Sequence, residues 1–272
     1  MLSFGYKIVD KEERIFLDII EDAFVNNYAV ELGLYGESER VREAFATLPS
    51  SQKNMHFNHY RYTMIELQEK EALLREDIAT AHKIGAPYAV HHIAKNPMTR
   101  RKEYQPQMME MVLNALERAE EICVEENFTL YVENTYEPLT FYWKLFETLH
   151  AKEYRKLQFC FDIGHAKIWS DATFDEWILF LGRLEQMGFD IHFHLHANRG
   201  LLDEHLSFIE MEALGFDGDD YAFSDTTYAQ MVEKIMTRFP QKRKIFEVKS
   251  QYAIENMAWA HLLRQRTQST LV

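Results

Sequence analysis

Histidine is unevenly placed in this chain of 272 residues, and its placement is the first sign of chemistry. Of twelve histidines, nine lie in or directly after short apolar runs that resemble β-strands. Because imidazole is the commonest metal ligand among protein side chains, this pattern predicts a metal site built from several strand ends. The nine are His56, His59, His91, His92, His165, His192, His194, His196 and His205.

Acidic side chains stand at the ends of the same kind of run. Glu133 ends TLYVE, Asp162 ends LQFCFD, and Glu247 follows KRKIF. Asp203 and His205 follow the histidine-rich run at 191–196. A single residue of this kind is more often a helix cap or a packed side chain. Polar and charged groups at six successive strand ends instead indicate a shared metal centre, because buried charges need partners.

Strand-like and helix-like segments alternate along the chain, in eight units. Such alternation implies parallel strands with right-handed crossovers, and eight units in about 250 residues match a (β/α)8 TIM barrel. We therefore predict an α/β fold with one TIM-barrel domain over residues 1–272, with a doubly wound open sheet as the alternative. The strands are predicted near residues 2–7, 28–34, 54–59, 86–93, 128–132, 157–163, 191–197 and 244–248.

In a TIM barrel the active site lies at the C-terminal ends of the strands and in the loops after them. Side chains alternate across a strand, so His192, His194 and His196 share one face, and His196 lies nearest that rim. The loop at 198–224 has no clear helix or strand. Long loops without structure inside compact domains are usually functional, so we expect this one to border the site.

The formal net charge of −13 at pH 7 narrows the classes of partner. Proteins that bind nucleic acids usually present a basic surface, so the charge argues against nucleic acid and membrane partners. No run approaches the roughly 20 apolar residues of a membrane helix, and the N-terminus lacks the pattern of a secretory signal. We interpret Cys123 and Cys160 as reduced core thiols of a cytoplasmic protein.

Five motifs occur in a fixed order: Val-Glu-Asn-Thr (132–135), Phe-Asp-Ile-Gly-His (161–165), His-Leu-His-Ala-Asn (194–198), Asp-Glu-His-Leu (203–206) and Phe-Glu (246–247). Together they resemble the xylose isomerase-like TIM-barrel superfamily. This group includes endonuclease IV and the sugar (phosphate) isomerases and epimerases related to tagatose epimerase. The resemblance covers predicted strands three to eight. It implies a small carbohydrate substrate, and it leaves a homodimer open because barrel enzymes of this kind often dimerise.

The resemblance also implies roles for single residues. As in the epimerases, Glu133, Asp162, His196 and Glu247 would hold one divalent ion, and His165 and Arg199 would bind substrate oxygens. As in endonuclease IV, up to three zinc ions would be held by those four metal ligands together with His56, His91, His165, Asp203 and His205. The register leaves three alternatives open, namely His59 for His56, His92 for His91 and His194 for His196. The mixed ligand set favours manganese or zinc and leaves cobalt, iron and magnesium open.

Two departures from endonuclease IV bear on the number of metal ions. That family has an aspartate close after the strand-seven histidine, where this chain reads Ala197-Asn198-Arg199. The glycine-rich turn that often follows Asp-x-His-Leu is replaced here by the sequence SFIEME at 207–212. Both changes put the geometry of a third metal ion in doubt.

We therefore predict a metal-dependent sugar or sugar-phosphate isomerase or epimerase. In such an enzyme Glu133 and Glu247 would remove and return a proton beside a metal-polarised carbonyl. The alternative is an endonuclease IV-like phosphoesterase with two or three metal ions. A non-catalytic binding protein on the same scaffold is a third class, and the presence of both glutamates argues against it.

Overall fold

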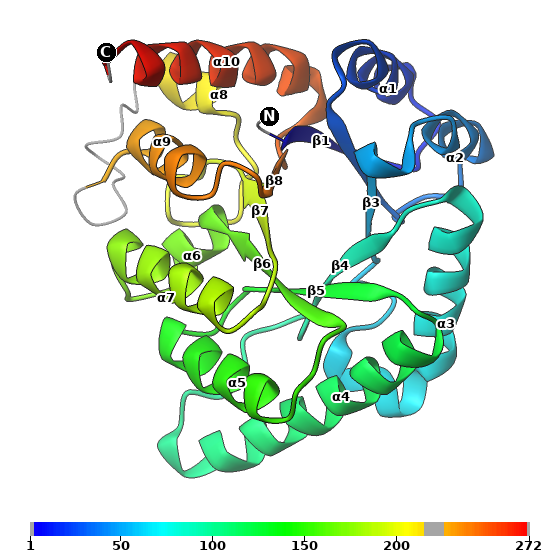
Figure 1. The fold of residues 1–272 in the computed structure, drawn as a ribbon, viewed down its shortest axis with the longest axis vertical. Coiled ribbons are helices and arrows are strands. Elements are labelled where there is room, and N and C mark those ends of the chain that lie inside the picture. Colours follow the sequence, from blue (N-terminus) through cyan, green and yellow to red (C-terminus); the bar gives the residue numbers. More distant parts are fainter. Residues whose placement is uncertain (1–2, 215–225, 271–272) are drawn as a thin grey trace.

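The computed structural model describes residues 3–214 and 226–270, and its centre is a closed barrel of eight parallel strands (Figure 1). Each strand pairs with the next in sequence, and β8 closes the barrel against β1. The predicted TIM barrel is confirmed, and the open sheet is excluded. The strands are β1 (Ser3–Val9), β2 (Ala29–Gly33), β3 (Lys53–His56), β4 (Tyr88–His92), β5 (Thr129–Glu133), β6 (Leu157–Asp162), β7 (Ile191–Leu195) and β8 (Arg243–Phe246).

Helices surround the barrel and return the chain from one strand to the next (Figure 1). Two of them begin with capping boxes, in which Thr173 and Thr227 accept from the backbone of the third helical residue. The α-helices are α1 (Arg14–Asn26), α2 (Glu39–Ala46), α3 (Leu67–Ile84), α4 (Gln105–Glu125), α5 (Leu139–Ala151), α6 (Ile163–Trp169), α7 (Phe174–Gln186), α8 (Phe208–Ala213), α9 (Tyr228–Arg238) and α10 (Ala253–Thr270). None of those described is long and apolar enough to cross a membrane.

Two predicted boundaries were wrong. The loop at 198–224 contains the short helix α8, which begins where Ser207 accepts from the amide of Glu210; residues 215–225 lie outside the described part. Strand β3 ends at His56, so His59 lies in the following loop rather than in the strand. The apolar run around Phe57 is buried, and it is not a continuation of the strand.

Two layers lie on either side of the barrel wall. Outward side chains pack against the helices, as Phe159 of β6 does against Tyr142, Phe146 and Phe180 with ring centroids 5.0–5.8 Å apart. Inward side chains of several strands are instead charged or hydrogen-bonding. The barrel interior therefore holds polar chemistry, and the apolar core lies between the strands and the helices.

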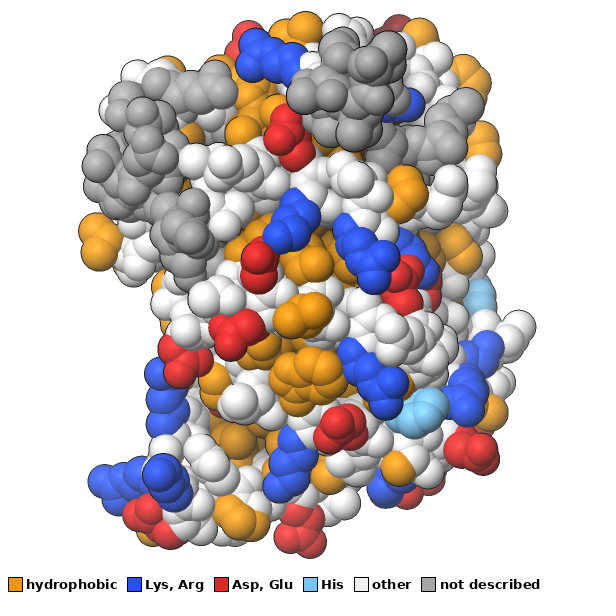
Figure 2. Space-filling model, turned by 60° about the vertical axis from the view of Figure 1, so that its left-hand side comes forward, with side chains coloured by type: hydrophobic (Ala, Val, Ile, Leu, Met, Phe, Trp, Pro, Cys, Tyr) orange, Lys and Arg blue, Asp and Glu red, His pale blue; other side chains and the backbone are white. Residues whose placement is uncertain are grey.

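The face of the molecule that lies on the left in Figure 1, where α7 and α9 are, is shown in Figure 2. Lysine and arginine side chains are interspersed there with aspartate and glutamate. This face therefore has no large patch of one sign.

Candidate metal centre

Glu133, the last residue of β5, lies at the middle of the polar cluster and is buried. Its carboxylate oxygens lie 3.1 Å from Nε2 of His56, 3.0 Å from Nε2 of His92 and 3.1 Å from Nδ1 of His194. Burial by itself raises the pKa of Glu133, but the histidines around it hold that pKa well below its usual range. Glu133 is therefore an anion, and it is surrounded by ring nitrogens of histidines on three other strands.

The Asp-Ile-Gly-His motif folds back on itself directly after β6. Asp162 caps α6 by accepting from the amide of His165 at 2.7 Å, while its two oxygens lie 3.1 Å from Nε2 of His196. Gly164 allows this approach, because a Cβ there would lie 2.0 Å from Cε1 of His196. The glycine of the motif is thus needed to seat the histidine of β7 against the carboxylate.

The loop after β7 brings Asp203 and His205 back over the barrel mouth. An isolated antiparallel bridge between Ala197 and Leu206 closes this loop. Asp203 Oδ2 lies 3.2 Å from Nε2 of His165 and 2.9 Å from Nε2 of His205. His205 has a left-handed backbone with φ of 48°, which is uncommon for a residue other than glycine. The bridge holds that conformation and places the pair.

Glu247, directly after β8, completes the cluster from the other side. Its Oε2 lies 2.9 Å from Nδ1 of His194, and its Oε1 lies 2.5 Å from the ammonium of Lys7 on β1. Burial alone raises the pKa of Glu247, and Lys7 is the main neighbour that brings it well below the ordinary value. Glu247 is therefore ionised next to a buried cation.

Four histidines at the rim share one hydrogen-bonding pattern, in which Nδ1–H donates to a backbone carbonyl and Nε2 faces a carboxylate. Metal-ligating histidines usually donate their second ring nitrogen in this way, which fixes the tautomer and leaves the other nitrogen free for an ion. The pattern supports a metal centre more directly than histidine content does. The pairs are His56 Nδ1 to Phe57 O (3.0 Å), His165 Nδ1 to Asn134 O (2.9 Å), His196 Nδ1 to Ala197 O (3.4 Å) and His205 Nδ1 to Glu247 O (3.0 Å).

The charges of the clustered side chains also indicate a metal ion. Five carboxylates meet the histidines at the mouth and inside the barrel, and within the described residues Lys7 is the only lysine or arginine with a nitrogen within 4 Å of them. Buried carboxylates need positive partners. Divalent ions supply that charge, and the donor set of imidazole and carboxylate fits them. The carboxylates are Glu31, Glu133, Asp162, Asp203 and Glu247.

The structure brings most of the predicted site residues together. Within 4.8 Å, ligand atoms group as His56 with His92 and Glu133, as Asp162 with His165 and His196, and as His196 with Asp203 and His205. Glu247 reaches the same cluster through His194. His59 lies beside it, stacked on His92 with ring centroids 4.1 Å apart.

Two predicted residues are not brought to the cluster. His91 points to the outer side of β4, where its ring lies 4.6 Å from Tyr62, because side chains alternate along the strand. Its neighbour His92 faces the barrel interior instead. Of the two alternatives that the sequence left open on β4, the structure therefore places His92, and not His91, in the cluster. Arg199 is paired with Glu204 in the exposed loop rather than with the cluster carboxylates.

Sequence reasoning missed three residues of the barrel interior: Lys7, Glu31 and Tyr35. Glu31 interrupts the apolar run YAVELGL, and Lys7 interrupts the first strand. A charged residue inside a predicted buried strand was the signal for both. The Tyr35 hydroxyl lies 3.0 Å from Nδ1 of His56 and 3.1 Å from Nδ1 of His59, and its sequence context gave no such signal.

A cavity of about 390 Å³ opens above the cluster, within the usual range for a small-molecule site. Aromatic rings form much of its wall, which suits the apolar faces of a small polar molecule. Among the described side chains that line it, Lys95 is the only lysine or arginine. The lining residues are Tyr35, His56, His59, Tyr60, His92, Lys95, Tyr136, His165, Trp169, Asp203, His205 and Glu247.

Comparison with known protein families identifies the family of this chain. The profile of the xylose isomerase-like TIM-barrel family matches residues 54–232, which is more than half of the sequence. The chain therefore belongs to that family. A comparison with curated protein sequences gave no match.

Several solved structures share the fold at low sequence identity. A D-tagatose 3-epimerase-like protein is 16% identical with a TM-score of 0.69, and the alignment covers 100% of both chains. The TTHB071 protein from Thermus thermophilus, soaked with ZnCl2, is 17% identical with a TM-score of 0.64 over 97% of this chain and 99% of that one. The 3-keto-D-glucoside 4-epimerase YcjR from E. coli is 14% identical with a TM-score of 0.62 over 96% and 100%.

Proposed function

We propose that this protein is a divalent-metal-dependent isomerase or epimerase that acts on a small ketose sugar. One observation carries the proposal. Glu133 and Glu247 come from non-adjacent strands, and an oxygen of each lies within 3.1 Å of the same Nδ1 of His194. Two ionised carboxylates thus converge on one imidazole, and one of them, Glu247, also lines the cavity. The names of two similar structures, both sugar epimerases or like them, support the same class.

Glu133, Asp162, His196 and Glu247 are the residues that we propose to hold the catalytic ion. When bound, such an ion polarises a carbonyl oxygen and stabilises the negative charge that develops as the neighbouring carbon loses its proton. Manganese, zinc, cobalt and iron all suit this ligand set. His165 lies beside Asp162 and lines the cavity, so we propose that it contacts an oxygen of the bound substrate.

The two glutamates perform the proton transfer in this proposal. Both are ionised near neutral pH, because their pKa values lie well below the ordinary value. Glu247 lines the cavity, so its carboxylate can meet a C–H bond of a bound ketose and accept the proton. In an epimerase, Glu133 takes up a proton from water and delivers it to the opposite face of that carbon, while Glu247 releases to water the proton that it accepted.

The cavity favours an uncharged sugar over a sugar phosphate. Phosphate groups in proteins are usually bound by arginine or lysine side chains, and the described lining includes only Lys95, whose Nζ already lies 3.3 Å from Glu66 Oε2. The hydroxyls of Tyr35 and Tyr136 and the ring of His59 offer partners for sugar hydroxyls. Free ketoses are therefore the first substrates to test.

Solvent-proton exchange tests the proposal. Metal-loaded protein is incubated with a panel of free ketoses in heavy water, and deuterium at the carbon beside the carbonyl is measured by NMR. We expect one ketose to exchange and then to isomerise or epimerise. Glu247→Gln should abolish the exchange, whereas Glu204→Gln, a change in the exposed loop, should retain it. Exchange by no ketose, or undiminished exchange by Glu247→Gln, would refute the proposal.

A multi-metal phosphoesterase is the second candidate, and a specific observation favours it. The groups around Glu133, Asp162 and Asp203 lie side by side, with histidines enough for more than one ion. Clusters of two or three ions activate a water molecule and stabilise both oxygens of a phosphoester displacement. Hydrolysis of phosphodiester model substrates, without any exchange on ketoses, would select this candidate over the isomerase.

A further inference from the structure

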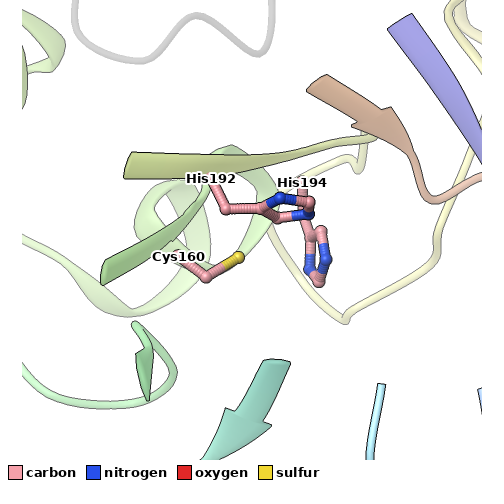
Figure 3. Close-up of side chains that lie close together, drawn as sticks. All are labelled: Cys160, His192 and His194. Carbon is pink, nitrogen blue, oxygen red and sulfur yellow. The ribbon is translucent and has the colours of Figure 1, made fainter. Parts of the chain in front are cut away.

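A second cluster of ligand-type side chains lies inside the barrel, below the rim. Cys160 of β6 faces inward next to His192 and His194 of β7, and each has one ligand atom within 4.8 Å of the others (Figure 3). Cys160 and His192 are register partners on neighbouring strands. All three side chains are buried, with at most 1% of their surface exposed.

Glu31 of β2 approaches the same cluster from across the barrel. Its oxygens lie 3.1 Å from Nε2 of His192 and 2.9 Å from Nε2 of His194. Nevertheless, both Nε2 atoms and Glu31 Oε1 are buried without a hydrogen-bond partner of normal geometry. Buried polar atoms without a hydrogen bond require another partner, and an ion that all three atoms ligate would supply one.

From this arrangement we propose that the barrel interior binds a structural zinc ion through Cys160, His192, His194 and Glu31. Structural zinc is usually four-coordinate and tetrahedral, with Zn–N near 2.0 Å, which sets neighbouring ligand atoms about 3.3 Å apart. The separations of 2.9 and 3.1 Å are close to that value. A thiolate and a carboxylate also balance the charge of a divalent ion inside the barrel.

The ligand chemistry separates this inner site from the rim. A thiolate with two imidazoles favours zinc over manganese, whereas the rim set of carboxylates and imidazoles also accepts manganese or iron. The described inner ligands are sealed from solvent, so no coordination position is open to substrate. The inner ion would be acquired as the chain folds, as in other structural zinc sites.

The inner site also supports the rim. With Nε2 bound to the ion, His194 carries its proton on Nδ1 and donates it toward Glu133 Oε1 and Glu247 Oε2, at 3.1 and 2.9 Å. That donor would fix the two carboxylates in place. On the other side, the Tyr88 hydroxyl lies 3.2 Å from Nδ1 of His192 and fixes that ring. Only the link to the catalytic glutamates rests on the proposed function; the inner site itself does not.

Cobalt spectroscopy tests the site without reference to activity. The protein is expressed in cobalt medium under reducing conditions, and the thiolate-to-cobalt charge-transfer band is measured. We expect the band in the native chain and in Cys123→Ser, whose buried thiol lies on α4. The band should be absent from Cys160→Ser, and the bound metal per chain should fall by one ion.

A rim variant separates the two sites. Asp162→Asn weakens the rim and should leave the cobalt–thiolate band intact, because Asp162 is not among the inner ligands. Absence of the band in the native chain, its persistence in Cys160→Ser, or its loss in Asp162→Asn would each overturn the proposal.

A second measurement needs no variant at Cys160. X-ray absorption at the zinc edge of the native protein should show a sulfur ligand at about 2.3 Å. A zinc shell of nitrogen and oxygen alone would overturn the proposal even if Cys160→Ser failed to fold. If the rim proved catalytically inert while the sulfur shell was present, the proposed function would fail and the inner site would stand.

Discussion

The interior of the barrel and the layer outside its wall are made from the same strands and have opposite chemistry. Lys7 and Lys244 show the contrast, since both are buried lysines on the adjacent strands β1 and β8. Inside, Glu247 and Glu31 raise the pKa of Lys7 against the effect of burial. Outside, burial lowers the pKa of Lys244 to about 7. Side-chain alternation alone thus places one lysine in a charged cluster and the other in an apolar layer.

The contrast also suggests separate roles, with the outer layer supplying stability and the interior supplying the chemistry. Phenylalanine, leucine and tyrosine between the strands and helices supply the apolar burial that folds the chain. Inside the barrel, carboxylates and imidazoles held in fixed positions replace the apolar side chains. Changes at the rim of the barrel should therefore affect activity more than stability, and changes outside the wall should do the reverse.

The largest effect is expected inside, from Glu133→Gln. The substitution keeps the shape of the side chain but removes the anion that lies near His56, His92 and His194. We expect the exchange rate on the responding ketose to fall about 10³-fold, the size typical of a lost acid–base group. Retention of more than a tenth of the native rate, at full metal loading, would show that Glu133 does not take part.

Outside the wall, Phe159→Ala should produce the largest loss of stability. Phe159 is fully buried among Tyr142, Phe146 and Phe180. Removing its ring leaves a cavity and should cost about 3–5 kcal/mol in the free energy of unfolding, measured by urea denaturation. Phe159→Leu should cost less, and the folded fraction of both variants should keep its exchange rate. If the exchange rate of the folded fraction fell together with the free energy of unfolding, the two regions would not have separate roles.

Lys244 should make stability depend on pH. Unfolded lysine has a pKa near 10.4, and burial lowers the folded pKa to about 7, so the unfolded chain binds more protons between these values. The free energy of unfolding should therefore rise with pH across that window. We expect a rise of about 2 kcal/mol, smaller than the shift alone implies, because the ammonium donates to the carbonyls of Phe239 and Lys242.

Lys244→Met should flatten that pH profile. Lys234→Met, an exposed change on α9, is the matched control and should keep the native slope. Both profiles are obtained from urea denaturation between pH 7 and 10. An unchanged slope in Lys244→Met would mean that the buried amine is protonated throughout.

Much of the fold could be predicted from the sequence, because strand and helix periodicities alternate and a closed barrel satisfies all eight units. The strand ends also indicated Glu133, Asp162 and Glu247, since a carboxylate after a buried strand is costly without a partner. The contact between Lys7 and Glu247, 240 positions apart, was missed because Lys7 was not recognised as an inward-facing residue, although barrel closure places the first strand beside the last. The side taken by His91 or His92 depended on a one-residue register that adjacent histidines do not reveal.

The smallest effect is expected at His91 and His92, which are neighbours on β4 but lie on opposite sides of the barrel wall. His91→Leu removes two buried ring nitrogens that have no hydrogen-bond partner of normal geometry. Burial holds the pKa of His91 well below its usual range, so no charge is lost. Replacing unpaired polar atoms by an apolar group should leave the free energy of unfolding unchanged or raise it by about 1 kcal/mol.

His92→Leu is the matched change on the inner side and should behave differently. It removes the Nε2 that lies 3.0 Å from Glu133 and leaves that carboxylate with one imidazole fewer. We expect lower metal content and slower exchange from His92→Leu, and native values of both from His91→Leu. If the two variants instead lost metal equally, a one-residue step along β4 would not separate the chemistry of the barrel interior from the packing outside it.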